Sequence, residues 1–365
     1  MPLIIDAHED LAYNILSFNR DYRRPAAETR KLEENTGIPA LTGQALLGWP
    51  DYQRGQVALV VGTLFIVPDG FKGGDFETLV YRDFDEADRL YHDQYDLYRR
   101  LADDNPDMFR LVRSRADLQA VLAPWDAQPA HFPDTTHPVG LVMSMEGAEG
   151  IRDPGQLEEW WQLGLRLIGP VWAGSRLCGG TLQPGGFTAE GWAMLDRMQT
   201  IGYTLDIAHM TEMSALQALD RYQGTVIASH ANARALLKGL PGERHLSDLT
   251  IRRLVERDGI IGVVPFNRFL RPGWSRDDDR SLVTLDHLAA HIDYICQLAG
   301  DARHVALGTD FDGGFGLPEI PQELDTVADL PALGPVLARR GYSPEDIAAI
   351  FSANWRGLLE RTLPA

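Results

Sequence analysis

Eight short apolar runs recur along the chain and constrain its fold more than any other feature of the sequence. The first four are LIIDAHED from Leu3, VALVVGTLFIV from Val57, GLVMSMEG from Gly140 and LGLRLIGPVW from Leu163. The other four are YTLDIAHM from Tyr203, TVIASH from Thr225, GIIGVVPFN from Gly259 and HVALGTDFDGG from His304. Continuous apolar runs of this length are typical of strands that are buried on both faces.

Helical patterns separate most of these runs. Examples are SALQALDRY from Ser214, SDLTIRRLVERDG from Ser247 and LDHLAAHIDYICQLAG from Leu285. Eight buried strands that alternate with helices predict an α/β fold of the (β/α)8 type, the TIM barrel. The length of 365 residues suits one such barrel with insertions. Because nothing divides the pattern, we expect residues 1–365 to form a single domain.

The longest interruption lies between the second and third expected strands, at about residues 68–138, and we expect a long helical insertion there. It contains DEADRLYHDQYDLYRRLADD from Asp85, which we interpret as a pair of helices with an acidic, solvated face. A second irregular stretch, rich in proline and glycine, runs from Gly179 to Gly186. It is expected to form a loop over the mouth of the barrel.

The net charge of −18 argues against nucleic acid or an anionic membrane surface as a partner. The N-terminal sequence MPLIIDAHEDLAYN lacks the basic and apolar regions of a signal peptide, and no run reaches the roughly 18 apolar residues of a membrane-spanning helix. We therefore expect a cytoplasmic protein without a membrane partner. Cys178 and Cys296 form no CxxC pair and are expected to be small buried hydrophobes.

Imidazole and carboxylate side chains gather where the apolar runs end. These positions are His8 and Asp10 at the end of the first run, Glu146 in the third, His209 in the fifth, His230 in the sixth and Asp310 in the eighth. In a barrel of this kind the C-terminal ends of the strands face one common site. Residues two apart in a strand point the same way, so His8 and Asp10 can reach one metal ion together.

This inventory of side chains predicts a metal-dependent hydrolase. Imidazole and carboxylate ligands suit zinc, iron or manganese. Three histidines with two or three carboxylates exceed the four ligands of a tetrahedral zinc ion. The surplus indicates two metal ions about 3.5–4 Å apart. Glu146 is the natural bridge between them, because a carboxylate has two oxygens to share.

Several segments, taken in order, carry a resemblance to a known family. They are IDAHEDL, SMEGAEG, LDIAHM, ASHANARAL followed by PGERHLSD, HIDYICQLAG running into HVALGTDFDGG, and FSANWRGLL. In these segments, which span nearly the whole chain, the protein resembles the renal (membrane) dipeptidase family, peptidase family M19, of the amidohydrolase superfamily. The combination of HxD, SHANAR and DFDG is fairly specific to that family.

The resemblance implies a role for each matching residue. His8 and Asp10 would bind a first metal ion, His209 and His230 a second, and Glu146 would bridge them. Asp310 would handle the proton, and Arg244 would hold the terminal carboxylate of the substrate. The resemblance further implies two divalent ions, most simply Zn²⁺, and hydrolysis of dipeptides, often with a D-residue on the C-terminal side, by a metal-bridging hydroxide. It is also compatible with a homodimer.

One position departs from the family. The family has a histidine six residues after an arginine, at the end of the fourth strand, where it is thought to polarise the scissile carbonyl. Counting from Arg166 in this sequence reaches Trp172. An indole donates one hydrogen bond but carries no positive charge. We therefore expect Trp172 to contribute to an altered substrate pocket, and we consider Arg176, His245 and Arg268 as groups that could polarise the carbonyl instead.

Three functions follow from these observations. The first is a metal-dependent dipeptidase. The second is a hydrolase of another small amide or of an N-acyl amino acid. The third is a catalytically silent homologue that only binds, which we disfavour because a buried cluster of carboxylates and imidazoles is costly to keep without use. Asp312, the second acid of DFDG, is expected to have a structural role in this motif.

Overall fold

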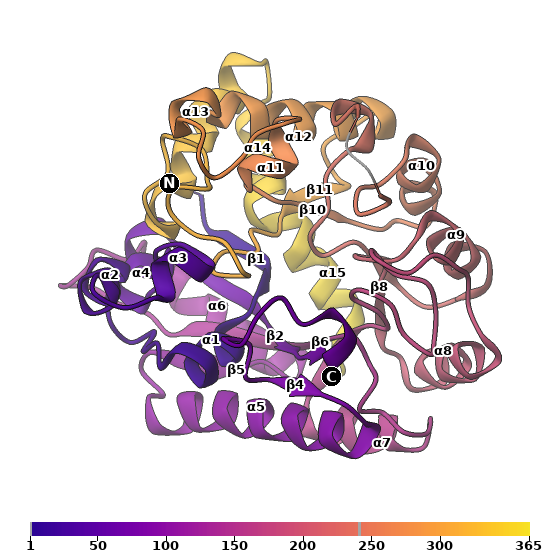
Figure 1. Ribbon diagram of the computed structural model, residues 1–365. Coiled ribbons are helices and arrows are strands. Elements are labelled where there is room, and N and C mark those ends of the chain that lie inside the picture. The colour runs from indigo at the N-terminus through magenta and orange to yellow at the C-terminus, as the bar shows by residue number, and fades with distance from the viewer. Residues whose placement is uncertain (1, 240–241) are drawn as a thin grey trace.

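Eight parallel strands form a ring at the centre of the molecule, with helices around it (Figure 1). The computed structural model describes residues 2–239 and 242–365. The strands of the ring are β1 (Ile4–Glu9), β2 (Val57–Phe65), β6 (Val139–Glu146), β7 (Leu165–Gly169), β8 (Thr204–Asp206), β9 (Val226–Ile227), β10 (Ile261–Val263) and β11 (Val305–Leu307). Each of them coincides with one of the eight apolar runs, and only β6 begins outside its run, by one residue.

The sheet follows the order β10-β11-β1-β2-β6-β7-β8-β9, and its two ends meet. Ala228 and Ile261 form a parallel bridge there. The amide of Ala228 donates to the carbonyl of Ile260 at 3.0 Å, and the amide of Gly262 donates to the carbonyl of Ala228 at 2.8 Å. These contacts close the ring between β9 and β10, so the predicted (β/α)8 barrel is confirmed.

Fifteen α-helices surround the ring in the described part of the chain. They are α1 (Leu11–Phe18), α2 (Ala26–Glu33), α3 (Ile38–Thr42), α4 (Trp49–Gly55), α5 (Phe84–Asp104), α6 (Arg115–Ala127), α7 (Gln156–Leu163), α8 (Ala189–Ile201), α9 (Glu212–Arg221), α10 (Asp248–Glu256), α11 (Asn267–Leu270), α12 (Leu285–Ala299), α13 (Leu333–Arg339), α14 (Pro344–Ala348) and α15 (Asn354–Thr362). The three helical segments named from the sequence correspond to α9, α10 and α12.

Shorter elements complete the structure. They are β3 (Val67–Pro68), β4 (Val80–Tyr81), β5 (Phe109–Leu111), the 3₁₀ turns η1 (Asp69–Phe71), η2 (Arg234–Leu236), η3 (Arg280–Leu282) and η4 (Val327–Ala332), and the π-helical turn η5 (Ala349–Ala353). Strand β3 pairs with β4, and β5 adds to the barrel sheet beside β6. The chain between β2 and β6 thus holds β3, η1, β4, α5, β5 and α6.

The interpretation of residues 85–104 as a pair of helices was wrong, because the segment is the single helix α5. Its N-terminus is capped by Asp83, whose side chain accepts a hydrogen bond from the amide of Glu86. No glycine or proline interrupts it, and one face is buried continuously, from Ala87 through Tyr91, Gln94 and Tyr98 to Ala102. Figure 1 shows α5 as one long helix below the barrel.

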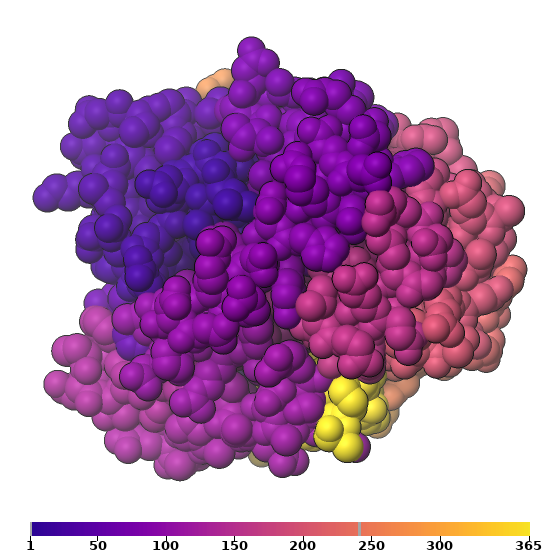
Figure 2. Space-filling model, turned by 90° about the horizontal axis from the view of Figure 1, so that it is seen from below, coloured from indigo at the N-terminus to yellow at the C-terminus, as the bar shows by residue number. Residues whose placement is uncertain are grey.

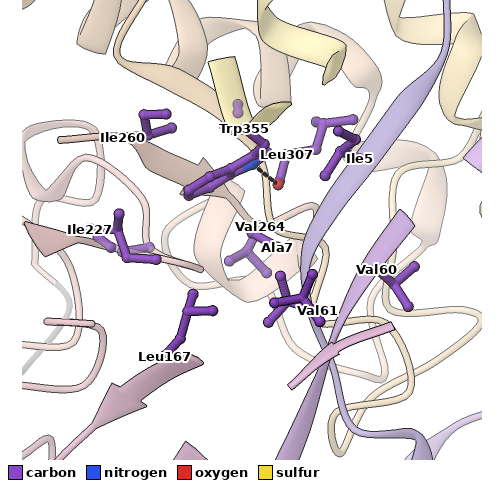
Figure 3. Close-up of a cluster of buried hydrophobic side chains, with 14 of the residues drawn as sticks. Ile5, Ala7, Val60, Val61, Leu167, Ile227, Ile260, Val264, Leu307 and Trp355 are labelled. Carbon is purple, nitrogen blue, oxygen red and sulfur yellow. Dashed lines mark hydrogen bonds between the residues drawn. The ribbon is translucent and has the colours of Figure 1, made fainter. Parts of the chain in front are cut away.

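Apolar side chains from several strands pack together with the C-terminal helix α15. Figure 3 shows Trp355 of α15 near Ile5, Val61 and Leu307, and its indole N–H donates to the carbonyl of Leu307 at 2.9 Å. From below, most of the visible surface belongs to the first half of the chain, and the C-terminal segment reaches it at one edge (Figure 2). Among the described residues, no helix is both long enough and apolar enough to span a bilayer.

Candidate metal centre

The strand ends of the barrel open into one cavity of about 480 Å³. The site residues that line it are Asp10, Glu146, Trp172, His209, His230, Arg244 and Asp310. His8, the remaining predicted ligand, is 2% exposed and contacts this group through Glu146 and Asp310. The structure therefore brings together every residue that the sequence predicted for the site.

Glu146, the last residue of β6, lies between the histidines. Its Oε2 is 3.0 Å from Nε2 of His8 and 4.0 Å from Nε2 of His230. Its Oε1 is 3.2 Å from Nε2 of His209. Asp10 and Asp310 flank His8, with carboxylate oxygens 3.8 Å and 3.9 Å from its Nε2. Each oxygen of Glu146 thus faces a different imidazole.

The other nitrogen of each imidazole meets a hydroxyl group. Nδ1 of His8 is 3.3 Å from Oγ1 of Thr63, Nδ1 of His209 is 3.0 Å from Oγ1 of Thr181, and Nδ1 of His230 is 2.7 Å from Oγ of Ser229. An imidazole that uses Nδ1 in this way keeps Nε2 available as a ligand. All three rings therefore present Nε2 toward Glu146.

Two site residues at strand ends have an unusual backbone conformation. His209 and Asp310 adopt left-handed conformations, with φ of 66° and 57°. Residues other than glycine rarely do so, and such positions cluster at functional sites. Two buried carboxylates organise the same ends. Asp6 accepts the amide of Thr309 at 2.7 Å, and Asp206 accepts the amides of Ala208 at 3.0 Å and Ser229 at 2.9 Å.

Burial dominates the electrostatics of the cluster. Burial lowers the pKa of His209 and His230 well below its usual range, so both rings are neutral. Burial raises the pKa of Glu146 and Asp310, the latter strongly. At His8 burial acts to lower the pKa, but the nearby carboxylates of Asp10 and Glu146 raise it well above the usual value.

These donors fit a divalent metal ion. Nε2 of His8 and Oδ1 of Asp10 are buried and have no hydrogen-bond partner among the described residues. Nε2 of His209 and Nε2 of His230 face each other at 2.9 Å, although the Nδ1 atom of each ring already meets a hydroxyl. Two neutral imidazoles that expose lone pairs to the same point are stabilised by a cation there.

Among the described residues, two groups of three have ligand atoms within 4.8 Å of one another. One is Glu146, His209 and His230, which agrees with the predicted second site. The other is His8, His230 and Asp310, so it contains Asp310 in place of Asp10. His230 belongs to both groups, which shows how closely the two predicted sites adjoin.

Comparison with known families decides where the chain belongs. Residues 2–361 match the model of the family described as membrane dipeptidase (peptidase family M19). The chain belongs to the M19 family. Membership confirms the resemblance seen in the sequence and the prediction of a hydrolase of the metallo-dipeptidase class. It also implies a divalent metal ion.

Individual proteins are similar to this chain over much of its length. An uncharacterized dipeptidase of Schizosaccharomyces pombe is 26% identical over 364 residues, which cover 96% of this chain and 78% of the relative. An uncharacterized protein in the pqqA 5′ region of Klebsiella pneumoniae is 32% identical over 232 residues, 61% of this chain and 82% of the relative.

Two solved structures share the fold of this M19 chain. One is described as dipeptidase AC, a metallopeptidase of family M19, with a TM-score of 0.79, 23% identity and coverage of 100% of this chain and 99% of that one. The other is a metallopeptidase from Rhodobacter sphaeroides, liganded with a phosphinate mimic of the dipeptide L-Ala-D-Ala. Its TM-score is also 0.79, at 23% identity and 99% coverage of both chains.

Arg244 brings a positive charge to the cavity. Both of its terminal nitrogens are buried and have no hydrogen-bond partner among the described residues. Burial lowers the pKa of Arg244, while Asp310 and Glu146 act to raise it. A guanidinium with unused donors can form a forked pair with a carboxylate. Its position in this M19 site suits the predicted contact with the end of a substrate.

Trp172 lines the cavity beside the cluster, with its ring centroid 6.4 Å from that of His209. The three residues considered as substitutes for a carbonyl-polarising histidine are not among the residues that line the cavity. Arg176 pairs with Glu149 at 3.2 Å and also with Glu190, away from the cavity, and Arg268 is exposed. His245 is buried against Phe269 and is not a lining residue. None of these three side chains therefore replaces the family's histidine beside Trp172 in the M19 cavity.

Two structural expectations for single residues are confirmed. Asp312 is fully enclosed, with Oδ2 3.2 Å from Nη1 of Arg20 and Oδ1 accepting the amide of Leu46 at 2.8 Å, so its role is structural. Cys178 and Cys296 are buried free thiols. The loop from Gly179 to Gly186 lies at the mouth as expected, since Thr181 and Leu182 line the cavity.

The hydroxyl groups behind the imidazoles were missed. Ser229 directly precedes His230, and Asp206 stands three residues before His209, as Asp6 stands two before His8. An acidic residue just before a strand-end histidine is a local signal that could have identified Asp206. Thr63 and Thr181 carry no such signal, because they reach their histidines from distant segments.

Proposed function

We propose that this chain hydrolyses the peptide bond of dipeptides at a centre of two divalent metal ions, most simply zinc. His8 and Asp10 would hold one ion, His209 and His230 the other, and Glu146 would bridge them. The observation that carries the proposal is the position of Glu146. Its two oxygens lie 3.0 Å from Nε2 of His8 and 3.2 Å from Nε2 of His209, so one carboxylate serves both groups.

The residues of the chain position a short substrate. When bound, divalent metal ions would polarise the scissile carbonyl and make a water molecule more acidic. Arg244 would bind the terminal carboxylate through its two unused nitrogens. Because Arg244 would bind the substrate's end close to the reacting bond, the site favours small substrates and positions that bond for attack.

Asp310 would move the proton. Its carboxylate lies 3.9 Å from Nε2 of His8 and adjoins the cavity. Burial raises the pKa of Asp310 well above its usual range, which is the direction required of a group that accepts and returns a proton near neutral pH. It would accept a proton from the attacking water and pass it to the leaving amine.

The test is a steady-state assay of wild type and Asp310→Asn against a dipeptide panel, with zinc or manganese supplied. We expect Asp310→Asn to keep its bound metal and lose roughly 10²–10⁴-fold in kcat, the usual contribution of a general acid–base group. Asp301→Asn removes a carboxylate that pairs with Arg303 on the surface and is the matched control. Full activity in Asp310→Asn would exclude the proposed proton carrier.

The same assay separates the alternatives. N-acyl amino acids offer Arg244 the same carboxylate without a free amine, so faster turnover of these than of dipeptides would reassign the substrate. A metal-loaded protein that cleaves no small amide would be the silent homologue. A homodimer stays a prediction from the family resemblance.

A further inference from the structure

Two groups of aromatic side chains line the cavity and have no part in the proposed metal binding or proton transfer. The first, which we call the tryptophan wall, consists of Tyr13 on α1, Phe65 at the end of β2 and Trp172 after β7. The ring centroids of Phe65 and Trp172 are 5.1 Å apart, and those of Tyr13 and Phe65 are 5.4 Å apart. Phe65 and Trp172 are only partly buried, so they present apolar surface to the cavity.

The second group, the phenylalanine wall, comes from the other side of the ring. It consists of Phe266 and Phe269, which follow β10, and Phe315, which follows β11. Phe266 stacks on Phe315 with centroids 4.2 Å apart and lies 4.8 Å from Phe269. The guanidinium carbon of Arg244 lies 5.3 Å from the centroid of Phe269. This wall therefore adjoins the group that would bind a carboxylate.

Charged groups in the cavity are few. Apart from the metal-binding cluster and Asp310, the described lining residues include only Arg244 and Glu77 as charged side chains. Glu77 accepts the amide of Gly73 in its own loop at 2.5 Å. Outside the metal-binding cluster, an acidic substrate side chain would therefore find no cationic side chain except Arg244, which binds the main-chain carboxylate, and its desolvation would be uncompensated.

We propose that the two walls are subsites that select dipeptides with a bulky apolar side chain at each position, an inference that rests on the proposed dipeptidase function. With the carboxylate on Arg244, the side chain of the C-terminal residue packs on the phenylalanine wall. The N-terminal residue then extends past the cluster, and its side chain packs on the tryptophan wall, whose Trp172 ring lies 6.4 Å from that of His209.

The placement of the walls makes the two preferences separable. The walls come from different arcs of the barrel order: the tryptophan wall follows strands between β1 and β7, and the phenylalanine wall follows β10 and β11. Apolar contacts of one side chain with a pocket change kcat/KM by roughly 10–200-fold. Truncating one wall should therefore weaken selection at one position of the substrate and leave selection at the other intact.

The experiment measures kcat/KM of the metal-loaded full chain for Ala-Ala, Leu-Ala, Ala-Leu, Asp-Ala, Ala-Asp and Lys-Ala, all of L configuration. We expect wild type to prefer Leu-Ala and Ala-Leu over Ala-Ala by roughly tenfold or more, and to cleave the charged dipeptides more slowly than Ala-Ala. In Trp172→Ala the Leu-Ala to Ala-Ala ratio should fall roughly tenfold, with the Ala-Leu to Ala-Ala ratio unchanged. Phe266→Ala should show the reverse.

Ratios of kcat/KM within one preparation cancel any loss of folded or metal-loaded protein. Trp192→Ala, which removes a tryptophan that stacks on Phe187 outside the cavity, is the matched control and should change neither ratio. Cleavage of dipeptides without apolar preference, a preference for Lys-Ala, or equal changes of both ratios in both variants would overturn the two-wall inference alone. Absence of cleavage of every dipeptide would overturn the proposed function and this inference with it.

Discussion

A hydroxyl group contacts the Nδ1 atom of each imidazole in the metal centre. At His230 the direction of the hydrogen bonds can be assigned. The Ser229 hydroxyl has one proton and donates it to Oδ2 of Asp206, so it must accept from Nδ1–H of His230. This fixes the tautomer that leaves Nε2 free. Carboxylate, hydroxyl and imidazole thus form one chain that ends at the metal-binding atom.

Ser229→Ala should weaken metal binding without unfolding the protein. Loss of a partner behind a ligating histidine typically costs 10–100-fold in metal affinity, and we expect roughly that range here. The measurement is competition with a chromophoric chelator, accompanied by circular dichroism. Ser281→Ala, at an exposed position, is the control. Unchanged affinity in Ser229→Ala would show that the hydroxyl does not orient His230.

His291 should make the metal-free protein sensitive to acid. Burial lowers its pKa from the ordinary value of 6.5 to about 4, and its Nδ1 accepts the amide of Ala233 at 3.2 Å. The unfolded chain takes up a proton as the pH falls below 6.5, whereas the folded chain does so only near 4. Stability is therefore lost as the pH falls between these values, on the order of 2 kcal/mol by pH 5.

His291→Gln replaces the imidazole by a neutral group that can still accept a hydrogen bond. We expect the free energy of unfolding of this variant to fall less between pH 7 and pH 5 than that of wild type, by on the order of 2 kcal/mol. Denaturant titrations of both proteins in the presence of a chelator provide the comparison. Equal losses in the two proteins would mean that His291 is not the group responsible.

At the scale of strands and helices, the apolar runs were sufficient to predict the barrel because each of its strands is buried on both faces. Strand ends were informative for the same reason, since a polar residue after a buried run has to face the common site. The residues that close the ring, Ala228 and Ile261, were not predictable, because the apolar runs do not show which residues pair. The aromatic walls were also missed, since Phe266 and Phe315 are distant in the sequence and meet only because β10 and β11 pair.

Two glycines shape the end of β9, from which His230 extends. A Cβ atom on Gly262 or on Gly308 would lie 1.8 Å from the carbonyl oxygen of Ser229. These glycines on β10 and after β11 therefore allow three strand ends to approach closely. No side chain could move aside to admit the extra methyl group, because the atom in the way belongs to the backbone.

Gly308→Ala should therefore displace the end of β9 together with His230. We expect a loss of stability of about 1–3 kcal/mol, typical of overpacking, and weaker metal binding. Thermal unfolding and metal competition would measure the two effects. Gly70→Ala, where a Cβ would meet no atom within 4 Å, is the control. A Gly308→Ala protein as stable as this control would contradict the close packing described at Ser229.

At the scale of the whole molecule, the ring of strands brings residues 8 to 310 of the sequence to one point. The ligands lie at or just beyond the C-terminal ends of four strands, β1, β6, β8 and β9, and Asp310 lies just beyond a fifth, β11. The unfolded chain offers no such cluster, so metal binding and folding are coupled. Membership of the M19 family and the buried, convergent Nε2 atoms agree with a divalent metal centre. In the proposed function, its full complement is two ions.

The most direct test of that centre is a titration of zinc into the metal-free protein, with bound metal and hydrolysis of Leu-Ala measured on the same samples. We predict that binding saturates at two zinc ions per chain and that the hydrolysis rate reaches its maximum only with the second. Glu146→Gln weakens the bridge between the two sites. In this variant we predict that neither zinc binding nor the hydrolysis rate saturates at two ions per chain. Saturation of both binding and hydrolysis at one ion in wild type, or zinc binding without hydrolysis, would contradict the proposed two-metal dipeptidase.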